Sequence, residues 1–147
     1  MLVKVKIGRR LAMDELKLQA RIVKEVQRKK GWAIKMANRH QGGVPDLFIK
    51  IITLPPVFIE CKKDKLSLTK LQQETLRRLH AANMPAGWLV HKQERHYHNL
   101  YVGADPNANE PRLTNSHLIT MTGKEWEVAE IVIAITYWSE VEIGKIG

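Results

Sequence analysis

Two apolar, strand-forming segments separated by a pair of prolines constrain the fold of this chain more than any other feature. Residues 47–52 read LFIKII, and residues 57–62 read VFIECK. Their β-branched and aromatic side chains favour extended structure, and proline cannot donate a ladder hydrogen bond from the middle of a strand. We therefore predict two strands that face each other across a turn at Pro55 and Pro56.

Chemically distinctive side chains lie at the ends of these strands that are remote from the turn. Asp46 directly precedes the first strand, and Glu60 and Lys62 end the second. A turn centred near residues 54–55 puts Asp46 opposite residues 62–63. Asp46 then lies within a couple of residues of Glu60, which alternation places on the same face of its strand as Lys62. We expect two carboxylates and an ammonium group to converge.

Such a group suits the hydrolysis of a phosphodiester bond. Hard divalent ions such as Mg²⁺ or Mn²⁺ prefer oxygen ligands, which Asp46, Glu60 and the backbone carbonyl of Cys61 can supply. A metal held there would polarise the scissile phosphate and lower the pKa of a bound water. Lys62 would orient that water or offset the charge that develops in the transition state. The pattern predicts a metal site with Asp46, Glu60 and Lys62 as catalytic residues.

Each of these residues also has an ordinary structural interpretation. A proline followed by an aspartate is a common turn pair, so Asp46 alone is typical of a turn or a helix cap. Glu60 and Lys62 alone are typical of charges that protect an edge strand from aggregation. The order of the features favours the functional interpretation, because GVPD, an apolar strand, a turn, a second strand ending in Glu-x-Lys and a glutamine-bearing helix occur in succession.

The rest of the chain alternates between helical and extended patterns. Apolar spacing and turn residues predict a helix over residues 11–30, a strand over 32–36, a helix from 68 to 82 and a strand over 87–91, which gives the order αβββαβ. Further strands are expected near residues 100–102 and 118–121. Thr122 and Glu125 form a possible capping box for a last helix, but residues 131–136 are β-branched enough to form a strand instead.

Length and composition limit the class of protein. A chain of 147 residues with 44% hydrophobic residues is long enough for one domain, which we take as residues 1–147. No apolar run approaches the roughly 18 residues of a membrane span, so we expect a soluble, intracellular protein that makes no membrane contact. The single cysteine, Cys61, cannot form an intramolecular disulfide or by itself build a zinc site.

The charge is distributed unevenly along the chain. Residues 1–99 contain 21 Lys and Arg against 8 Asp and Glu, whereas residues 100–147 contain 3 against 7. Lysines and arginines that neutralise phosphates gain affinity by releasing counterions, so the asymmetry favours a polyanionic partner such as DNA. A basic protein with solvated lysines has the same composition, so the charge alone does not decide the function.

The motifs together resemble the VRR-NUC branch of the PD-(D/E)XK nuclease superfamily. The resemblance is carried by GVPD at residues 43–46, FIECK at 58–62 and LSLTKLQ at 66–72, followed by Leu79 and the segment 88–90. It covers about residues 11–92 and is greatest to the small stand-alone members of phages and bacteria. Those members act as homodimers on branched DNA in the manner of Holliday-junction resolvases.

The resemblance implies both a fold and further site residues. The fold is a restriction-endonuclease-like α/β core, with a central mixed β-sheet flanked by helices, and residues 93–147 are a C-terminal extension that departs from the family pattern. The family has an acidic residue in its first helix and a glutamine soon after Glu-x-Lys, and Glu15 and Gln72 occupy those places. Glu15 would join the catalytic residues and the metal ligands Asp46, Glu60 and Cys61, and Gln72 would join the catalytic residues.

Glu15 and Gln72 each have an alternative. Glu15 lies on the apolar stripe of its helix, where a carboxylate needs a compensating cation or hydrogen bonds, but an acid in a first turn is also favoured by the helix dipole. Glu25, the competing acid of that helix, suits an exposed ion pair with Arg21 or Arg28. Gln72 also forms a capping box with Thr69, which would account for it without any catalytic role.

The function and assembly that we expect follow from these residues. We expect a Mg²⁺- or Mn²⁺-dependent endonuclease that acts on branched DNA as a homodimer, since cutting two strands symmetrically needs two active sites. The last apolar segment, with Val128, Ile131, Val132, Ile135 and Trp138, is a candidate dimer surface or part of the core. A restriction-like or nicking nuclease and a non-catalytic nucleic-acid-binding protein are the alternatives, and the four tryptophans favour core or interface positions over base stacking.

Overall fold

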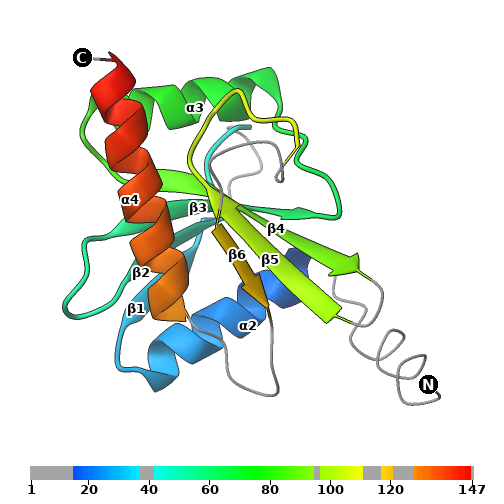
Figure 1. Cartoon of the computed structure of the whole chain (residues 1–147). Coiled ribbons are helices and arrows are strands. Elements are labelled where there is room, and N and C mark those ends of the chain that lie inside the picture. The colour runs from blue at the N-terminus through cyan, green and yellow to red at the C-terminus, as the bar shows by residue number, and fades with distance from the viewer. Residues whose placement is uncertain (1–14, 37–41, 95–96, 111–116, 121–127, 147) are drawn as a thin grey trace.

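Among the residues that the structure describes, six strands form one mixed sheet, and helices cover both of its faces (Figure 1). The computed structural model describes residues 15–36, 42–94, 97–110, 117–120 and 128–146. The elements follow the order α2 (Glu15–Arg28), β1 (Trp32–Lys35), β2 (Leu47–Lys50), β3 (Val57–Lys63), α3 (Lys70–Ala81), β4 (Ala86–Glu94), β5 (Tyr97–Gly103), β6 (His117–Thr120) and α4 (Val128–Ile146). The first six confirm the predicted αβββαβ order and the α/β fold class.

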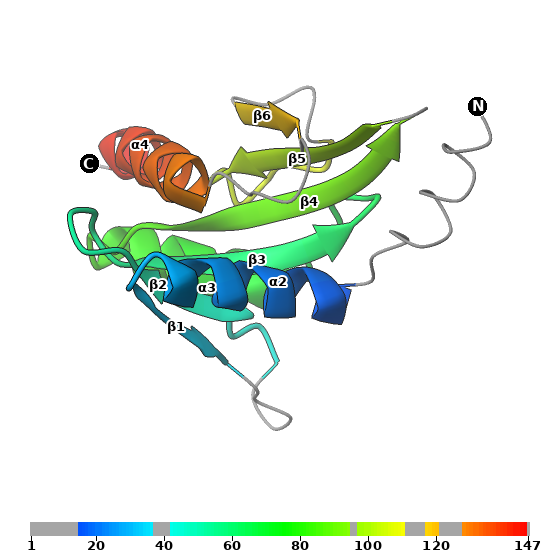
Figure 2. The ribbon, with the colours of Figure 1, turned by 90° about the horizontal axis from the view of Figure 1, so that it is seen from below.

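The strands lie in the sheet in their sequence order, from β1 to β6. Strands β3 and β4 are parallel and are connected through α3, whereas all other neighbouring strands are antiparallel. Seen from below, α2 lies in front of the strands and α3 lies behind them (Figure 2). The parallel pair therefore occupies the middle of the sheet, where both faces are covered.

Strand β3 separates two apolar cores. Its odd-numbered residues face α2 and α4, and its even-numbered residues face α3, as alternation requires. The core on the α2 and α4 side contains Leu18, Ile22, Val26, Leu47, Ile49, Val57, Ile59, Cys61, Leu89, Leu100, Val102, Val128, Ile131, Val132, Ala134 and Ile135. The core on the α3 side contains Leu66, Leu76, Ala86, Trp88, Val90, Tyr101 and Ala108.

The hairpin of β2 and β3 differs in register from the sequence prediction. Leu47 pairs with Ile59, so the hairpin is centred on Thr53, midway between them, and not on residues 54–55. The Lys50 ammonium group donates hydrogen bonds to backbone carbonyls of the loop that follows it. The loop therefore turns just ahead of Pro55 and Pro56, which cannot donate to the ladder. As a result the centre of the hairpin lies one to two residues earlier than predicted.

The apolar stripe of α2 confirms the helix predicted near the N-terminus. Leu18, Ile22 and Val26 are buried, at the spacing of one helix face. The helix ends at Arg28, and the left-handed residue that follows it is Lys30, with a φ of 60°, one residue before the predicted stop at Gly31. Residues 11–14 of the predicted helix lie outside the described part of the chain.

The C-terminal segment belongs to the same packing unit as the preceding strands. Residues 131–136 are helical, so the alternative of a strand there is wrong. Val128, Ile131, Val132 and Ile135 are fully buried against the sheet, which excludes them as a dimer surface because the core already covers them. Ser139 ties α4 to β4, since its hydroxyl accepts from the Ala86 N–H and donates to the Ala86 carbonyl. The predicted cap at residues 122–125 lies outside the described residues.

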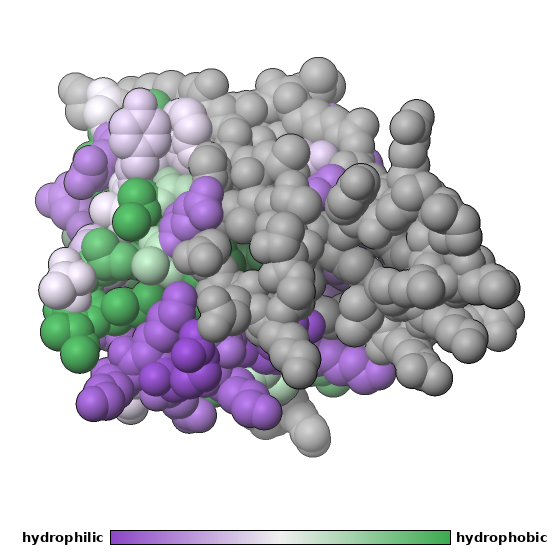
Figure 3. Space-filling view, turned by 60° about the horizontal axis from the view of Figure 1, so that its bottom comes forward, coloured by the Kyte–Doolittle hydropathy of each residue, from purple (hydrophilic) through white to green (hydrophobic). Residues whose placement is uncertain are grey.

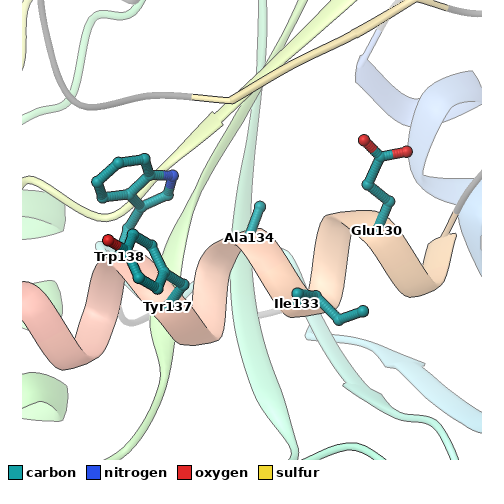
Figure 4. Close-up of a pocket in the computed structure, with 5 residues that line it drawn as sticks. All are labelled: Glu130, Ile133, Ala134, Tyr137 and Trp138. Atoms are coloured by element: carbon teal, nitrogen blue, oxygen red, sulfur yellow. The ribbon is translucent and has the colours of Figure 1, made fainter.

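The outer side of α4 remains in contact with solvent. Ile133 and Tyr137 are more than half exposed, and they line a shallow pocket together with Glu130, Ala134 and Trp138 (Figure 4). Figure 3 shows hydrophobic side chains gathered at the left of the view, beside hydrophilic ones. None of the described helices combines the length and the apolar composition needed to cross a membrane.

The burial pattern of α4 makes a direct prediction about stability. Ile131→Ala should lower the free energy of unfolding by about 2–5 kcal/mol, because it leaves a cavity in the core. Ile133→Ala, two residues along the same helix and 54% exposed, should change it by less than about 0.5 kcal/mol. Urea denaturation of both variants measures the difference, and equal losses would show that α4 does not pack on the sheet as described.

Candidate active site

Asp46 is held in place by the main chain of β3. Continuing the β2–β3 register by one residue beyond the pair of Leu47 and Ile59 puts Asp46 directly opposite Glu60. The Asp46 Oδ2 atom accepts a hydrogen bond of 2.8 Å from the Cys61 N–H. The Asp46 carboxylate thus accepts the Cys61 N–H in place of a main-chain carbonyl of the ladder. The predicted approach of Asp46 to Glu60 is confirmed, and the predicted pairing with residues 62–63 is wrong by two residues or more.

The glycine before this aspartate brings its loop against α3. Gly43 adopts a φ of 91°, a left-handed conformation that side chains strongly disfavour. A Cβ at this position would lie 2.6 Å from Leu71 Cγ and 2.9 Å from the Leu71 carbonyl oxygen. Only glycine permits this approach without a shift of the helix. The GVPD segment therefore packs on the first turn of α3, next to Gln72.

Glu60 is the most enclosed charged group of the site. Its exposed fraction is 5%, and its Oε1 atom accepts a hydrogen bond of 2.8 Å from the Gln72 side chain. The Lys62 ammonium group lies 3.9 Å from the same oxygen, which confirms that both side chains leave β3 on one face. The other oxygen, Oε2, is buried without a hydrogen-bond donor among the described residues.

Gln72 forms the predicted capping box and also contacts Glu60. Its Oε1 atom accepts from the Thr69 N–H at 2.9 Å, and its own backbone N–H donates to the Thr69 hydroxyl at 3.1 Å, which completes the capping box. Its Nε2 atom is left to donate to Glu60. The cap fixes the orientation of the amide, and this orientation presents the donor to the carboxylate.

The two carboxyl groups perturb each other. Burial, which is the largest cause, and the negative charge of Asp46 together raise the pKa of Glu60 from its usual 4.5 to about 8, against the opposing effect of Lys62. Burial also raises the pKa of Asp46, against the lowering effect of the hydrogen bond from Cys61. Two ionised carboxylates side by side repel each other, so the metal-free pair retains a proton near neutral pH.

Glu15 lies near the pair but does not join it in a compact cluster. It is the first residue of α2, it is half-buried, and its negative charge raises the pKa values of Glu60 and Cys61. In the described part of the chain, no three His, Cys, Asp or Glu side chains come together closely enough to hold a metal ion. Glu25 forms an ion pair of 3.1 Å with Arg28, as expected for a structural residue.

Two neighbours of the carboxyl pair have contrasting roles. The Cys61 thiol is fully buried in the core, and burial raises its pKa well above the usual value, so it stays protonated. Lys35 was not predicted as a site residue, yet its charge lowers the pKa of Asp46. The feature that could have identified Lys35 is the pairing of the first two strands, because Lys35 pairs with Leu47, the residue after Asp46.

Comparisons with known proteins identify no family for this chain. No model of a protein family matches the sequence, and no curated protein matches it. A solved structure that is similar to the chain is that of Hjc, a Holliday junction resolvase from the archaeal hyperthermophile Archaeoglobus fulgidus, with 13% sequence identity and a TM-score of 0.47. The similarity covers 84% of this chain and 98% of that one. At this level it assigns neither a family nor an activity.

The raised pKa of Glu60 predicts how stability depends on pH in the absence of metal. Because folding raises this pKa from 4.5 to about 8, the folded state holds the proton more tightly than the unfolded chain. The stabilisation of the folded state by this proton is fully present below the unfolded pKa of 4.5. It is lost as the pH rises through the folded pKa of about 8. Thermal unfolding in a chelator should therefore show a falling midpoint between about pH 5 and pH 9.

Glu60→Gln provides the control, because an uncharged amide resembles the protonated carboxyl group and does not titrate. The midpoint of this variant should fall less steeply over the same pH range than that of the unaltered protein. Parallel curves for the two proteins would mean that Glu60 ionises normally in the folded state, and the description of a buried, proton-sharing pair would then be incorrect.

Proposed function

We propose that this chain is a divalent-metal-dependent endonuclease that hydrolyses phosphodiester bonds in DNA. The observation that carries the proposal is the buried Glu60 Oε2 atom, which receives no hydrogen bond from an N–H or hydroxyl group among the described residues, in a carboxyl group that can bond Asp46 only by sharing a proton with it. Leaving a carboxylate oxygen unpaired in a buried site is costly, and a second carboxylate nearby increases the cost. A cation bound between the two groups removes both penalties.

The donor atoms suit Mg²⁺ or Mn²⁺ rather than a softer metal. Asp46 and Glu60 offer carboxylate oxygens, which hard divalent ions prefer. The Cys61 N–H points toward Asp46, and the N–H and carbonyl of one strand residue point to the same side, so the Cys61 carbonyl is suited to be a further ligand. We keep Glu15 as a further proposed ligand on the sequence resemblance, since its negative charge acts on Glu60 although its side chain does not form a compact cluster with Asp46 and Glu60.

Each protein group has a distinct part in the proposed reaction. A bound Mg²⁺ or Mn²⁺ supplies Lewis-acid activation of the phosphate and lowers the pKa of a bound water. Lys62 contributes a positive charge close to Glu60, where it orients the attacking water or offsets charge on the phosphate oxygens. Gln72 fixes the rotamer of Glu60 through its hydrogen bond, and the Cys61 N–H fixes Asp46. These contacts hold the ligands before any substrate binds.

The finer assignment rests on the sequence resemblance to the VRR-NUC branch of the PD-(D/E)XK nucleases. It favours branched DNA as the substrate and a homodimer as the active assembly, because a symmetric cut in two strands requires two active sites. The net charge of +9 agrees with a polyanionic substrate. A restriction-like or nicking enzyme would use the same residues, so only a panel of four-way junctions, flaps and linear duplexes separates these substrates.

Cleavage assays test the proposed catalytic residues. Asp46→Ala, Glu60→Gln and Lys62→Ala should each lower the rate of Mg²⁺-dependent cleavage by several orders of magnitude, because each removes a ligand or a charge needed in the transition state. DNA affinity in chelator should change little, since it rests on dispersed phosphate contacts. Lys63→Ala is the matched control, because Lys63 is exposed and leaves β3 on the other face.

Two outcomes would count against the proposal. Absence of cleavage by the unaltered protein with every substrate and metal would favour a nucleic-acid-binding protein whose carboxylates are structural. Cleavage by Glu60→Gln at nearly the unaltered rate would refute the assignment of the site. In the same assay Glu15→Gln should lower cleavage and metal affinity, whereas Glu25→Gln, which removes only the ion pair with Arg28, should not.

A further inference from the structure

A row of aromatic rings crosses the sheet near the carboxyl pair. The rings of Trp32 on β1 and Phe48 on β2 meet edge to face, with centroids 5.7 Å apart and an interplanar angle of 75°. Phe48 meets Phe58 on β3 in the same manner, at 5.0 Å and 66°. Such contacts hold aromatic rings in fixed orientations. The row therefore gives Trp32 a rigid support from the interior of the sheet.

The row lies on the same face of the sheet as the proposed catalytic residues. Phe58 and Glu60 are two residues apart on β3, so their side chains point the same way. The strand register pairs Ile34 with Phe48 and Phe48 with Phe58, which puts Ile34 and Trp32 on this face as well. From Glu60, Trp32 is about four residues along the strands and two strands across, or roughly 16 Å away.

This part of the face is open to solvent. Trp32 is 58% exposed and Ile34 is 38% exposed, whereas Trp88, on the same face of the sheet, is fully buried. Of the core and interface positions expected for the tryptophans, Trp88 occupies a core position, and Trp32 does not belong to the core. Among the described helices, α3 packs over the β4 half of this face, and α2 packs on the opposite side of β1.

The sequence around Trp32 is strongly basic. Residues 26–45 contain five Lys and Arg and no Asp or Glu, and Trp32 lies among them. Two of these lysines, at residues 29 and 30, precede the strand and are separated from it by Gly31, and Lys35, which ends the strand, is exposed but leaves it on the opposite face from Trp32. An exposed aromatic ring close to lysines is an arrangement suited to binding single-stranded nucleic acid, because phosphates meet the cations while a base stacks on the ring.

We propose that Trp32 is a stacking platform for an unpaired base of the DNA substrate, a few nucleotides from the scissile phosphate. This inference rests on the proposed nuclease function, and it specifies which feature of the DNA the protein recognises. A strand of duplex DNA advances about 3.4 Å per nucleotide, so roughly 16 Å corresponds to about five nucleotides. Because bases in an intact duplex are stacked on each other, Trp32 selects DNA in which a base is free, as at a flap or a branch.

A protein partner is the competing explanation for an exposed tryptophan on an edge strand. Edge strands that pair with another chain usually lack charged residues, whereas lysines on an edge discourage such pairing. The lysines beside Trp32 therefore favour a polyanion over a second sheet. A contact between two copies of this chain through β1 would nevertheless show itself as a change in oligomeric state when Trp32 is replaced.

The test compares two DNA ligands that differ only in unpaired bases. Binding in chelator, measured by fluorescence anisotropy, uses a linear duplex and the same duplex with a single-stranded flap. Trp32→Ala should weaken binding of the flapped DNA by roughly tenfold or more and leave duplex binding unchanged. Trp32→Phe keeps an aromatic ring and should lose less affinity for the flapped DNA than Trp32→Ala. Tyr137→Ala, an exposed aromatic on α4, is the matched control and should bind both ligands normally.

Several outcomes would overturn the proposal. Equal weakening for both ligands would mean that Trp32 contributes only to general affinity, and no weakening would mean that it contacts no DNA. A fall in molar mass by light scattering in Trp32→Ala, with DNA binding unaltered, would assign Trp32 to a protein contact. Trp32 is exposed and should not affect folding, and an unchanged thermal midpoint checks this.

The outcome for Trp32 is separable from that for the catalytic residues. If the unaltered protein cleaves DNA and Trp32→Ala retains the same preference for flapped over duplex DNA, the nuclease proposal stands and the stacking proposal fails. If the unaltered protein cleaves nothing but Trp32→Ala loses affinity for the flapped ligand alone, the stacking proposal stands and the nuclease proposal fails.

Discussion

The burial of two neighbouring carboxyl groups is the constraint on which the rest of the site depends. Asp46 and Glu60 face each other at the open end of the β2–β3 hairpin, and each would be unfavourable there as an isolated ion. The protein supplies one fixed donor to each, from the Cys61 main chain and from Gln72. It leaves Glu60 Oε2 without a donor among the described residues. A site built in this way is completed by a proton or a cation.

Helix α3 joins the stability of the fold to the geometry of this pair. The capping box between Thr69 and Gln72 is a local device that begins the helix, but it also turns the Gln72 amide toward Glu60. Gly43 brings the loop that carries Asp46 against the same helical turn. The two carboxyl groups are thus positioned from strand β3 and from the start of α3, two rigid parts of the fold, and not from a loop alone.

Much of this arrangement follows from local sequence, and the remainder depends on tertiary contacts. Alternation along residues 57–62 correctly predicted a common face for Glu60 and Lys62, and the Thr69–Gln72 spacing correctly predicted the cap. The hairpin register was missed because Lys50 organises its loop before the prolines. The cap at Gln72 was weighed against a place in the site, whereas the amide has separate acceptor and donor atoms, one for the Thr69 N–H and one for Glu60. Burial of α4 and exposure of Trp32 depend on which faces the helices cover, which periodicity alone does not specify.

The most direct test of a metal site between these groups is a crystal structure of the protein with Mn²⁺ bound, examined by anomalous scattering. We expect a peak within about 2.5 Å of carboxylate oxygens of both Asp46 and Glu60, with Gln72 still donating to Glu60. In Glu60→Gln crystals treated identically, the peak should be absent or much weaker. A peak elsewhere on the protein, or none at saturating Mn²⁺ with both carboxyl groups ordered, would contradict the account.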